Sequence, residues 1–298
     1  QTVIFDATLT TVVGDRIPLP VPELLMVLKA GNRLMIDDGN LEFTVTAVGG
    51  TWVSTVASTD GLLKSRKGVS APGVRIDVPS LSEKDIEDAR FGLSIGVDAI
   101  AMSFVRDPAD IYTLRTLTAN KVPLIAKIEM AEAVEKLAEI VKVSDGIMVA
   151  RGDLGVEMPF EQLAVVQKEI ISACNRAGKP VITATQMLDS MIERPRPTRA
   201  EVTDIANAVL DGTDALMLSG ETSVGAFPFA AVETMAKVAV ATESRFDYDA
   251  ALVLAHQRYG KASLTDAVSD AATSIAEDMG AVAILCGTST GSTARAVA

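Results

Sequence analysis

Histidine and cysteine are scarce in this sequence, and their scarcity argues against several kinds of catalytic site. Its 298 residues include one histidine, His256, and two cysteines, Cys174 and Cys286. No other group of catalytic type stands beside His256, so histidine-based triads and HExxH zinc sites are poorly supported. The cysteines lie far apart in apolar runs, which predicts reduced core residues and neither a disulfide nor a zinc site.

Basic charge and long apolar runs are also lacking. The sequence has 27 Lys and Arg residues against 39 Asp and Glu residues, a formal net charge of −12. Proteins that follow nucleic-acid phosphates are usually basic, so we expect no nucleic-acid partner. No apolar stretch approaches the roughly 20 residues of a membrane helix, and the first residues lack the pattern of a signal peptide. These absences predict a cytoplasmic protein with no membrane partner.

What is present is an ordinary globular composition, with 48% hydrophobic and 22% charged residues. Residues 1–72 are predicted to form a small antiparallel β domain. The run Asp37–Asn40 is typical of a tight hairpin turn between two of its strands. The strand-like runs are Val3–Phe5, Leu34–Ile36, Leu41–Thr46 and Trp52–Val56.

Residues 73–244 are predicted to alternate between strands and helices. No Gly-x-Gly-x-x-Gly follows a strand, so we prefer part of a TIM barrel to a doubly wound sheet, although eight units close a barrel and five are predicted here. The predicted strands are nearly continuous apolar runs, as in parallel sheets covered on both faces: Asp98–Val105, Val122–Glu129, Ser144–Asp153, Pro180–Thr185 and Ala215–Glu221. Helices are predicted over Ala131–Ile140, Phe160–Ala177, Thr198–Asp211 and Phe229–Thr242.

Residues 245–298 are predicted to begin a further α/β domain. We expect a helix over Leu264–Met279 and a strand over Ala281–Cys286. The hydroxyl-rich run Thr288–Thr293 then opens another helix. This run could cradle a phosphate, although plain helix capping explains it equally well.

Charged side chains gather at the predicted strand ends. Lys127 and Glu129 alternate along one strand and therefore share a face. Arg151 and Asp153 end the next strand. Asp153 lies between Gly152 and Gly155, where we predict a turn whose backbone N–H groups can approach an anion. Two carboxylates and a lysine at one point suit a divalent cation and an anionic substrate. Taken alone, Lys127 and Glu129 would be explained equally well as a structural ion pair.

Two more side chains are candidates with simpler explanations beside them. Thr185 ends a predicted strand and offers a hydroxyl for binding or proton transfer, but a strand-end threonine often has only local hydrogen bonds. Lys67 could reach a nucleotide phosphate from the β domain, but surface lysines are usually solvated.

Several motifs follow one another in a fixed order along this sequence. They are Lys67–Val69, Leu81–Asp85, Ser103–Arg106, Lys127–Glu129, Ile147–Glu157, Val181–Leu188, Pro197–Glu201, Ala206–Asp214 and Met217–Thr222. They run from about Lys64 to Thr222, far beyond a single short pattern, and in this order the sequence resembles the pyruvate kinase family.

The resemblance implies a (β/α)8 TIM barrel, of which strands 4–8 are in this chain. An inserted small β-barrel lid domain and the start of an α/β carboxy-terminal domain would accompany it, usually in a homotetramer. The implied reaction is the last step of glycolysis, in which phosphoryl transfer from phosphoenolpyruvate to ADP gives pyruvate and ATP.

The resemblance also implies a role for each candidate residue. Glu129 and Asp153 would hold Mg2+, and Lys127 would stabilise the phosphoryl group in flight and the enolate left behind. Backbone groups of Gly152 and Asp153 would bind substrate oxygens, while Thr185 would contact the substrate near the carbon that is protonated. Lys67 would touch the nucleotide, and the lid would exclude water.

This sequence departs from the family at two points. Met130 stands where the family commonly has asparagine, beside a metal ligand. The family's first three barrel strands, with an arginine for the substrate phosphate and the ligands of a monovalent cation, precede the lid and are not in this sequence. We therefore expect part of a longer enzyme and assign no K+ ligands. K+ dependence and an allosteric effector loop at Thr288–Thr293 are expected from kinship alone.

Two other functions remain open. A Mg2+-dependent lyase or aldolase acting on pyruvate-like substrates could use a similar barrel, but Lys67 and the lid argue against it because a lyase needs no nucleotide. A non-catalytic relative is the other alternative. The intact set of Lys127, Glu129, Asp153 and Thr185 argues against that loss of chemistry.

Overall fold

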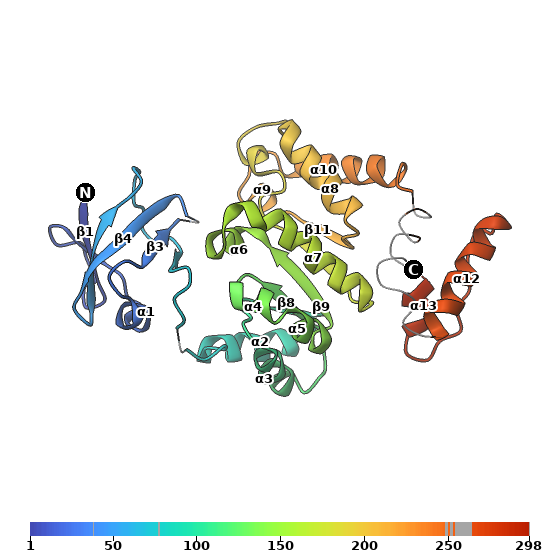
Figure 1. Ribbon diagram of the computed structural model, residues 1–298, viewed down its shortest axis with the longest axis horizontal. Helices are drawn as coiled ribbons and strands as arrows, with labels where there is room; N and C mark the ends of the chain where they lie inside the picture. The colour runs from blue at the N-terminus through green and yellow to red at the C-terminus, as the bar shows by residue number, and fades with distance from the viewer. Residues whose placement is uncertain (38, 77, 248–249, 251–252, 254–263, 298) are drawn as a thin grey trace. The chain divides into compact units, whose positions relative to one another are not determined.

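The computed structural model describes residues 1–37, 39–76, 78–247, 250, 253 and 264–297. The chain divides into two compact units, Gln1–Met235 and Ala236–Ala298. The first unit contains a six-stranded and a five-stranded sheet (Figure 1). His256 lies outside the described residues. None of the described helices combines the length and the apolar character needed to cross a membrane.

The six-stranded sheet is formed by the region predicted to be a β domain. Its strands lie in the order β2-β1-β5-β4-β3-β6, and neighbouring strands are antiparallel except for the parallel pair β1 and β2. Strands β2 and β6 are its edges, so the described pairings do not close the predicted β barrel. The strands are β1 Thr2–Asp6, β2 Arg16–Pro18, β3 Arg33–Ile36, β4 Leu41–Val48, β5 Trp52–Ala57 and β6 Val69–Ser70.

Alternation of apolar and polar residues builds the core of this sheet. In β4, Leu41, Phe43 and Val45 are buried while the residues between them are not. Phe43 meets Phe5 edge to face, with ring centroids 5.1 Å apart. The predicted hairpin is confirmed, because Ile36 pairs with Leu41 across the Asp37–Asn40 turn. The all-β prediction missed one helix, α1 Pro22–Val27, which buries Leu24 and Leu25.

The five-stranded sheet is parallel throughout and contains the predicted strands in sequence order. The order β11-β10-β9-β8-β7 has no reversal, whereas a doubly wound sheet reverses at its switch point. This order supports the predicted barrel segment. Side chains of β9 are buried along its whole length, as expected for a parallel strand covered on both faces. The strands are β7 Ile100–Met102, β8 Leu124–Ile128, β9 Gly146–Ala150, β10 Val181–Ala184 and β11 Ala215–Met217.

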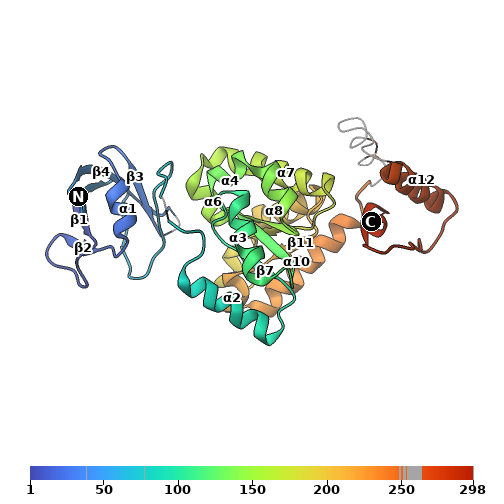
Figure 2. The same cartoon turned by 90° about the horizontal axis from the view of Figure 1, so that it is seen from below.

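Helices gather around these parallel strands (Figure 2). Three of them begin with capping boxes, at Ser82, Asp107 and Thr198, whose side chains accept hydrogen bonds from backbone N–H groups of the first turn. Cys174 lies fully buried in the shared apolar core, as predicted, and burial raises the pKa of its thiol to about 12. The helices are α2 Glu83–Ile95, α3 Pro108–Thr118, α7 Leu163–Arg176, α8 Arg199–Leu210 and α10 Pro228–Glu243, with 3-10 turns at Phe160–Gln162 and Asp189–Ile192.

Three predicted elements differ from the structure. The helix expected over Ala131–Ile140 is two helices, α4 Ala131–Glu135 and α5 Leu137–Val143, which meet at Lys136. The turn expected after β9 is instead helix α6 Arg151–Glu157. Its glycines have no left-handed φ. A Cβ on Gly155 would lie 3.3 Å from Leu163, which is a tight contact, whereas a Cβ on Gly152 would meet Thr185 at an ordinary 3.6 Å. The last strand stops at Met217, and Glu221 lies in the short helix α9 Gly220–Ser223.

The second unit, Ala236–Ala298, contains helices in its described part. The predicted helix over Leu264–Met279 is confirmed as α12 Leu264–Asp278. The strand predicted over Ala281–Cys286 is wrong: these residues form no strand, and Val282 and Leu285 are almost fully exposed. Helix α13 Ser292–Val297 follows the hydroxyl-rich run, in which Thr288 Oγ1 accepts a hydrogen bond from Gly291 N at 2.9 Å. That local bond favours capping as the explanation of this run.

Candidate active site

The end of β8 brings Lys127 and Glu129 together. Lys127 Nζ lies 2.6 Å from Glu129 Oε1 and donates a hydrogen bond to Ser103 Oγ at 3.0 Å. Glu129 is only 1% exposed, and its Oε2 accepts a hydrogen bond from Phe104 N at 2.6 Å. Ser103 and Phe104, which follow β7, therefore bind the side chains of the Lys127–Glu129 pair at the end of β8.

One oxygen of Glu129 keeps capacity for a further ligand. Glu129 Oε1 is buried and has no hydrogen-bond donor with acceptable geometry; its 2.6 Å contact with Lys127 is an ion pair only. Burying a carboxylate oxygen without hydrogen bonds is costly. The Lys127 ammonium offsets part of that cost, and the oxygen has lone pairs left for a second cation, so the donor set fits a hard metal ion.

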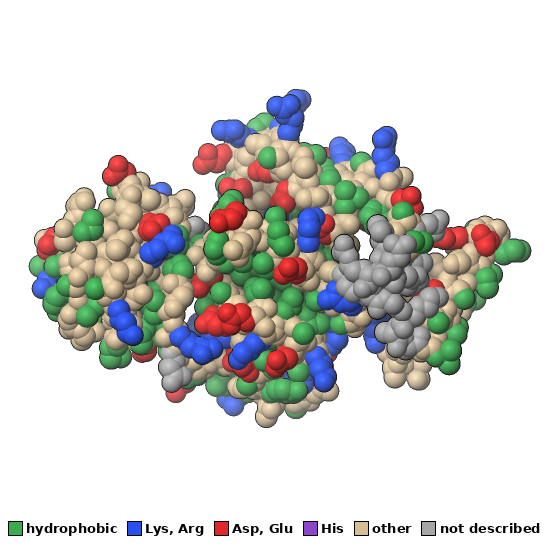
Figure 3. Space-filling view, viewed as in Figure 1, with side chains coloured by type: hydrophobic (Ala, Val, Ile, Leu, Met, Phe, Trp, Pro, Cys, Tyr) green, Lys and Arg blue, Asp and Glu red, His purple; other side chains and the backbone are tan. Residues whose placement is uncertain are grey.

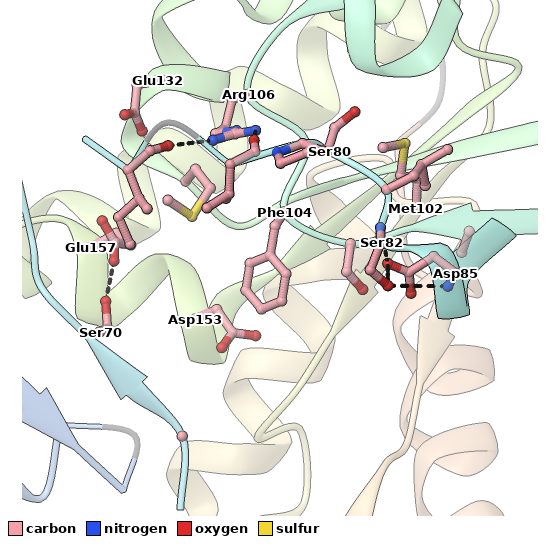
Figure 4. Close-up of a pocket in the computed structure, with 18 of the residues that line it drawn as sticks. Ser70, Ser80, Ser82, Asp85, Met102, Phe104, Arg106, Glu132, Asp153 and Glu157 are labelled. Atoms are coloured by element: carbon pink, nitrogen blue, oxygen red, sulfur yellow. Dashed lines mark hydrogen bonds between the residues drawn. The ribbon is translucent and has the colours of Figure 1, made fainter. Parts of the chain in front are cut away.

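Asp153 faces a large cavity from the first turn of α6. The cavity has a volume of about 1030 Å3, and its lining includes Asp153, Ser103 and Phe104. Figure 4 shows the side chains of Asp153 and Phe104 directed into it. A carboxylate in a helix's first turn is stabilised by the N–H groups there. Lys127 and Glu129 are not among the residues that line this cavity; their hydrogen-bond partners Ser103 and Phe104 are, and these two residues connect the pair to the cavity that Asp153 faces.

Glu157 is a carboxyl group of this cavity that sequence reasoning did not select. Burial raises the pKa of Glu157, and the nearby charges of Glu132 and Asp153 raise it further. Ser70, in β6, donates a hydrogen bond to Glu157 Oε1 and opposes that rise (Figure 4). This contact joins the six-stranded sheet to the helix that carries Asp153. Glu157 lies inside the Ile147–Glu157 motif, but its partner is 87 residues away.

Gly152 and Thr185, both proposed for substrate binding, contact each other. Gly152 N donates to Thr185 Oγ1 at 2.7 Å, and that hydroxyl donates to Ala184 O at 2.6 Å. The hydroxyl is therefore already used as both donor and acceptor. A substrate oxygen reaching the Gly152 amide would compete with Thr185 for it.

Arg151 does not join Asp153 in a charged cluster, as its sequence position suggested. Its guanidinium pairs with Asp204 of α8 at 2.7 Å and donates to Thr185 O at 2.7 Å. It also donates to Ala184 O at 3.2 Å. Arg151 therefore holds the end of β10 against the helix layer. Asp204 gave no local signal in the sequence, because 53 residues separate it from Arg151.

Backbone strain is concentrated at two of these strand ends. Phe104 after β7 has φ +53°, and Thr185 and Gln186 after β10 have φ +68° and +53°. Left-handed backbone is uncommon for residues with a side chain and clusters at functional sites. At Phe104 it accompanies an N–H group directed at Glu129. No sequence motif had singled out Phe104 for this role.

The remaining candidates belong to other parts of the chain. Lys67 forms an ion pair with Asp37 Oδ1 at 2.5 Å inside the six-stranded part, and its neighbour Gly68 lines the cavity. Thr288–Thr293 belongs to the second unit. Among the described residues, no cluster of three or more His, Cys, Asp or Glu side chains could hold a metal. A metal here would therefore take two protein carboxylates at most, with other ligands from substrate and water.

Comparisons with known proteins agree with this architecture. Residues 2–232 match the family model described as pyruvate kinase, barrel domain. The pyruvate kinase of Clostridium acetobutylicum is 46% identical over 294 residues, which cover 96% of this chain and 62% of that protein. The pyruvate kinase of Mycobacterium tuberculosis is 47% identical over 287 residues, which cover 95% and 60% respectively.

A solved structure extends the likeness to three dimensions. A pyruvate kinase from Cryptosporidium parvum superposes with a TM-score of 0.89 at 40% identity, over 100% of this chain and 63% of that one. The five-stranded sheet is thus a segment of a TIM-type α/β barrel. The chain spans about three fifths of the length of these relatives. Because the family model covers most of its length, this chain belongs to the pyruvate kinase family.

Proposed function

We propose that this chain carries the active site of a phosphotransferase that moves the phosphoryl group of phosphoenolpyruvate to ADP, giving pyruvate and ATP. The observation that carries the proposal is the pair of half-buried Lys127 and buried Glu129 at the end of a barrel strand, with one carboxylate oxygen left without a hydrogen bond. Family membership supports the same reaction.

Glu129 and Asp153 are the residues we assign to Mg2+. The unsatisfied Oε1 atom of Glu129 and the placement of Asp153 in the cavity support this assignment. When bound, the ion would neutralise charge on the phosphoryl and substrate oxygens. K+ is expected from kinship only, and we assign it no ligands.

Lys127 is assigned to charge stabilisation. Ser103 and Glu129 hold its ammonium from two sides, so the positive charge is fixed in place before any substrate binds. Such preorganised charge is the main source of rate enhancement in phosphoryl transfer. It would stabilise both the phosphoryl group in transfer and the enolate oxygen of the product.

Thr185 and Gly152 are assigned to the substrate. Breaking the phosphoenolpyruvate P–O bond leaves an enolate, and pyruvate forms when its terminal carbon takes a proton. Thr185 Oγ1, which donates to Ala184 O in the structure, would contact the substrate near that carbon and relay to it a proton taken from solvent water, so that the hydroxyl keeps a proton of its own. Backbone groups of Gly152 and Asp153 would bind substrate oxygens.

The finer assignments extend the same proposal to the rest of the chain. Residues 1–72 would be the lid, with Lys67 near ADP; residues 73–244 would be the barrel segment, and residues 245–298 the start of a carboxy-terminal domain. Thr288–Thr293 would belong to an allosteric effector loop. The whole enzyme would be a cytoplasmic homotetramer.

The test is product formation by the complete protein. We expect pyruvate to form from phosphoenolpyruvate only when ADP and Mg2+ are both supplied. Glu129→Gln should weaken the affinity for Mn2+, measured by electron paramagnetic resonance, because an amide is a poorer ligand than a carboxylate. Pyruvate formation without nucleotide would support the lyase instead, and no turnover at all would support the non-catalytic relative.

A further inference from the structure

Arg106 forms contacts that neither the reaction nor the barrel core requires. Its Nη1 atom donates to Ile76 O at 2.9 Å, and its Nη2 atom donates to Val78 O at 2.8 Å. Both carbonyls lie in the connection between β6 of the six-stranded sheet and α2 of the barrel segment. Figure 4 shows the guanidinium against this backbone. One side chain therefore holds the segment that joins the two sheets.

The backbone of Arg106 is itself firmly placed. Arg106 N donates to Asp110 Oδ2 at 2.8 Å, and Asp110 also accepts from Asp107 N at 3.1 Å as part of the capping box of α3. Val105, immediately before it, is completely buried. The guanidinium thus projects from a fixed point, and its planar fork can donate to two carbonyls at once.

The same short segment touches the candidate catalytic groups. Ser103 Oγ accepts from Lys127, Phe104 N donates to Glu129, and Arg106 donates to the connection. Three residues within a run of four thus contact the lysine, the carboxylate and the connection to the β domain. Arg106 therefore holds the connection two residues away from Phe104, whose N–H group orients Glu129.

We infer that Arg106 is a positioning residue that anchors the connection of the β domain to the strand ends carrying Lys127 and Glu129. This inference rests on the proposed function for its kinetic consequences. The β domain carries Lys67, assigned to ADP, whereas the metal and phosphoenolpyruvate are assigned to the strand ends. Loosening the anchor therefore affects the nucleotide and leaves the metal site in place.

Arg106→Met in the complete protein tests the anchor, because methionine keeps an unbranched side chain and loses every donor. Arg75→Met is the matched control: Arg75 lies in the same connection, is 74% exposed, and reaches Glu132 only at 3.9 Å. Arg106→Lys keeps the charge and can restore one of the two hydrogen bonds.

We expect Arg106→Met to lower kcat/KM for ADP roughly ten- to a hundredfold, the scale of a small misplacement of a bound group. Its KM for phosphoenolpyruvate and its affinity for Mn2+ should stay within about twofold of wild type, with Arg106→Lys intermediate for ADP. Arg75→Met should match wild type. Equal losses for ADP, phosphoenolpyruvate and Mn2+ would overturn the inference, as would an unchanged kcat/KM for ADP.

Hydrogen–deuterium exchange separates this inference from the proposed function. Without any substrate, peptides covering residues 69–76 should exchange faster in Arg106→Met than in Arg75→Met. Faster exchange in a protein with no kinase activity would support the anchor and refute the proposed reaction. Equal exchange in the two variants would refute the anchor whatever the activity.

Discussion

Two neighbouring strand ends of this barrel segment each carry a basic side chain paired with a carboxylate. The two pairs differ in whether a polar atom is left without a hydrogen bond. After β8, Lys127 faces Glu129, and one oxygen of the buried carboxylate has no hydrogen bond. After β9, Arg151 pairs with Asp204 and also donates to two carbonyls of β10. The Lys127 pair keeps capacity for a ligand, and the Arg151 pair is saturated. Unused capacity separates a reactive pair from an architectural one.

Removal of Lys127 should have the largest effect on catalysis. Lys127→Met should lower kcat about a thousandfold, in line with the loss of a preorganised charge that acts in the transition state, while KM for phosphoenolpyruvate changes little. Steady-state kinetics of the complete protein measure both. Lys136→Met, at the more exposed pair with Asp107, is the control and should keep wild-type kcat. A rise in KM at constant kcat would place Lys127 in binding alone.

Removal of Arg151 should instead affect the free energy of unfolding. Arg151→Met leaves Asp204 and two strand-end carbonyls without their partner, and we expect a loss of about 3 kcal/mol with kcat of the folded protein reduced by less than about tenfold. Denaturant unfolding measures it. Arg115→Met, at the more exposed pair with Asp145, should cost less. A kcat loss as large as that of Lys127→Met, at unchanged stability, would erase the distinction between the pairs.

The smallest expected effect is on the pH dependence of folding stability, through the carboxyl group of Glu157. Burial raises the pKa of Glu157, so the folded state holds its proton more tightly than the unfolded chain. Its contribution to stability is therefore complete below its usual pKa of 4.5 and is lost as pH rises through the folded value. Glu157→Gln cannot ionise and keeps an acceptor for Ser70. Its stability relative to wild type should increase as pH rises.

Unfolding in EDTA across that pH range measures this difference, so that no metal ion contributes. Glu161→Gln, at an exposed glutamate four residues further along, is the control and should follow wild type at every pH. A difference between Glu157→Gln and wild type that does not vary with pH would show that ionisation of Glu157 costs the folded state nothing.

Sequence patterns over a few residues predicted the features that depend on interactions between neighbouring residues. The continuous apolar strands, the missing dinucleotide fingerprint and the helix start at Thr198 predicted the parallel order and the helices that cover it. Alternation along the strand predicted that Lys127 and Glu129 share a face, and the structure places them 2.6 Å apart. These features depend on residues within a few positions of one another.

Features that depend on distant residues were missed or misplaced. The sequence grouped Arg151 with Asp153, because nothing near it shows that Asp204 lies within reach. Phe104 was overlooked because its role comes from a left-handed backbone and an N–H group, which any residue type can supply. Gly152 and Gly155 suggested a turn, although both lie in helix α6, where the small size of Gly155 serves close packing against Leu163.

The buried cysteine has a consequence for handling this protein. With a pKa of about 12, five units above neutral pH, roughly one Cys174 side chain in a hundred thousand carries the thiolate that alkylating and oxidising reagents attack. The apolar core also shields its sulfur completely from solvent. Peroxide or a maleimide dye should therefore spare Cys174 while the barrel stays folded, and modification of this thiol would report unfolding.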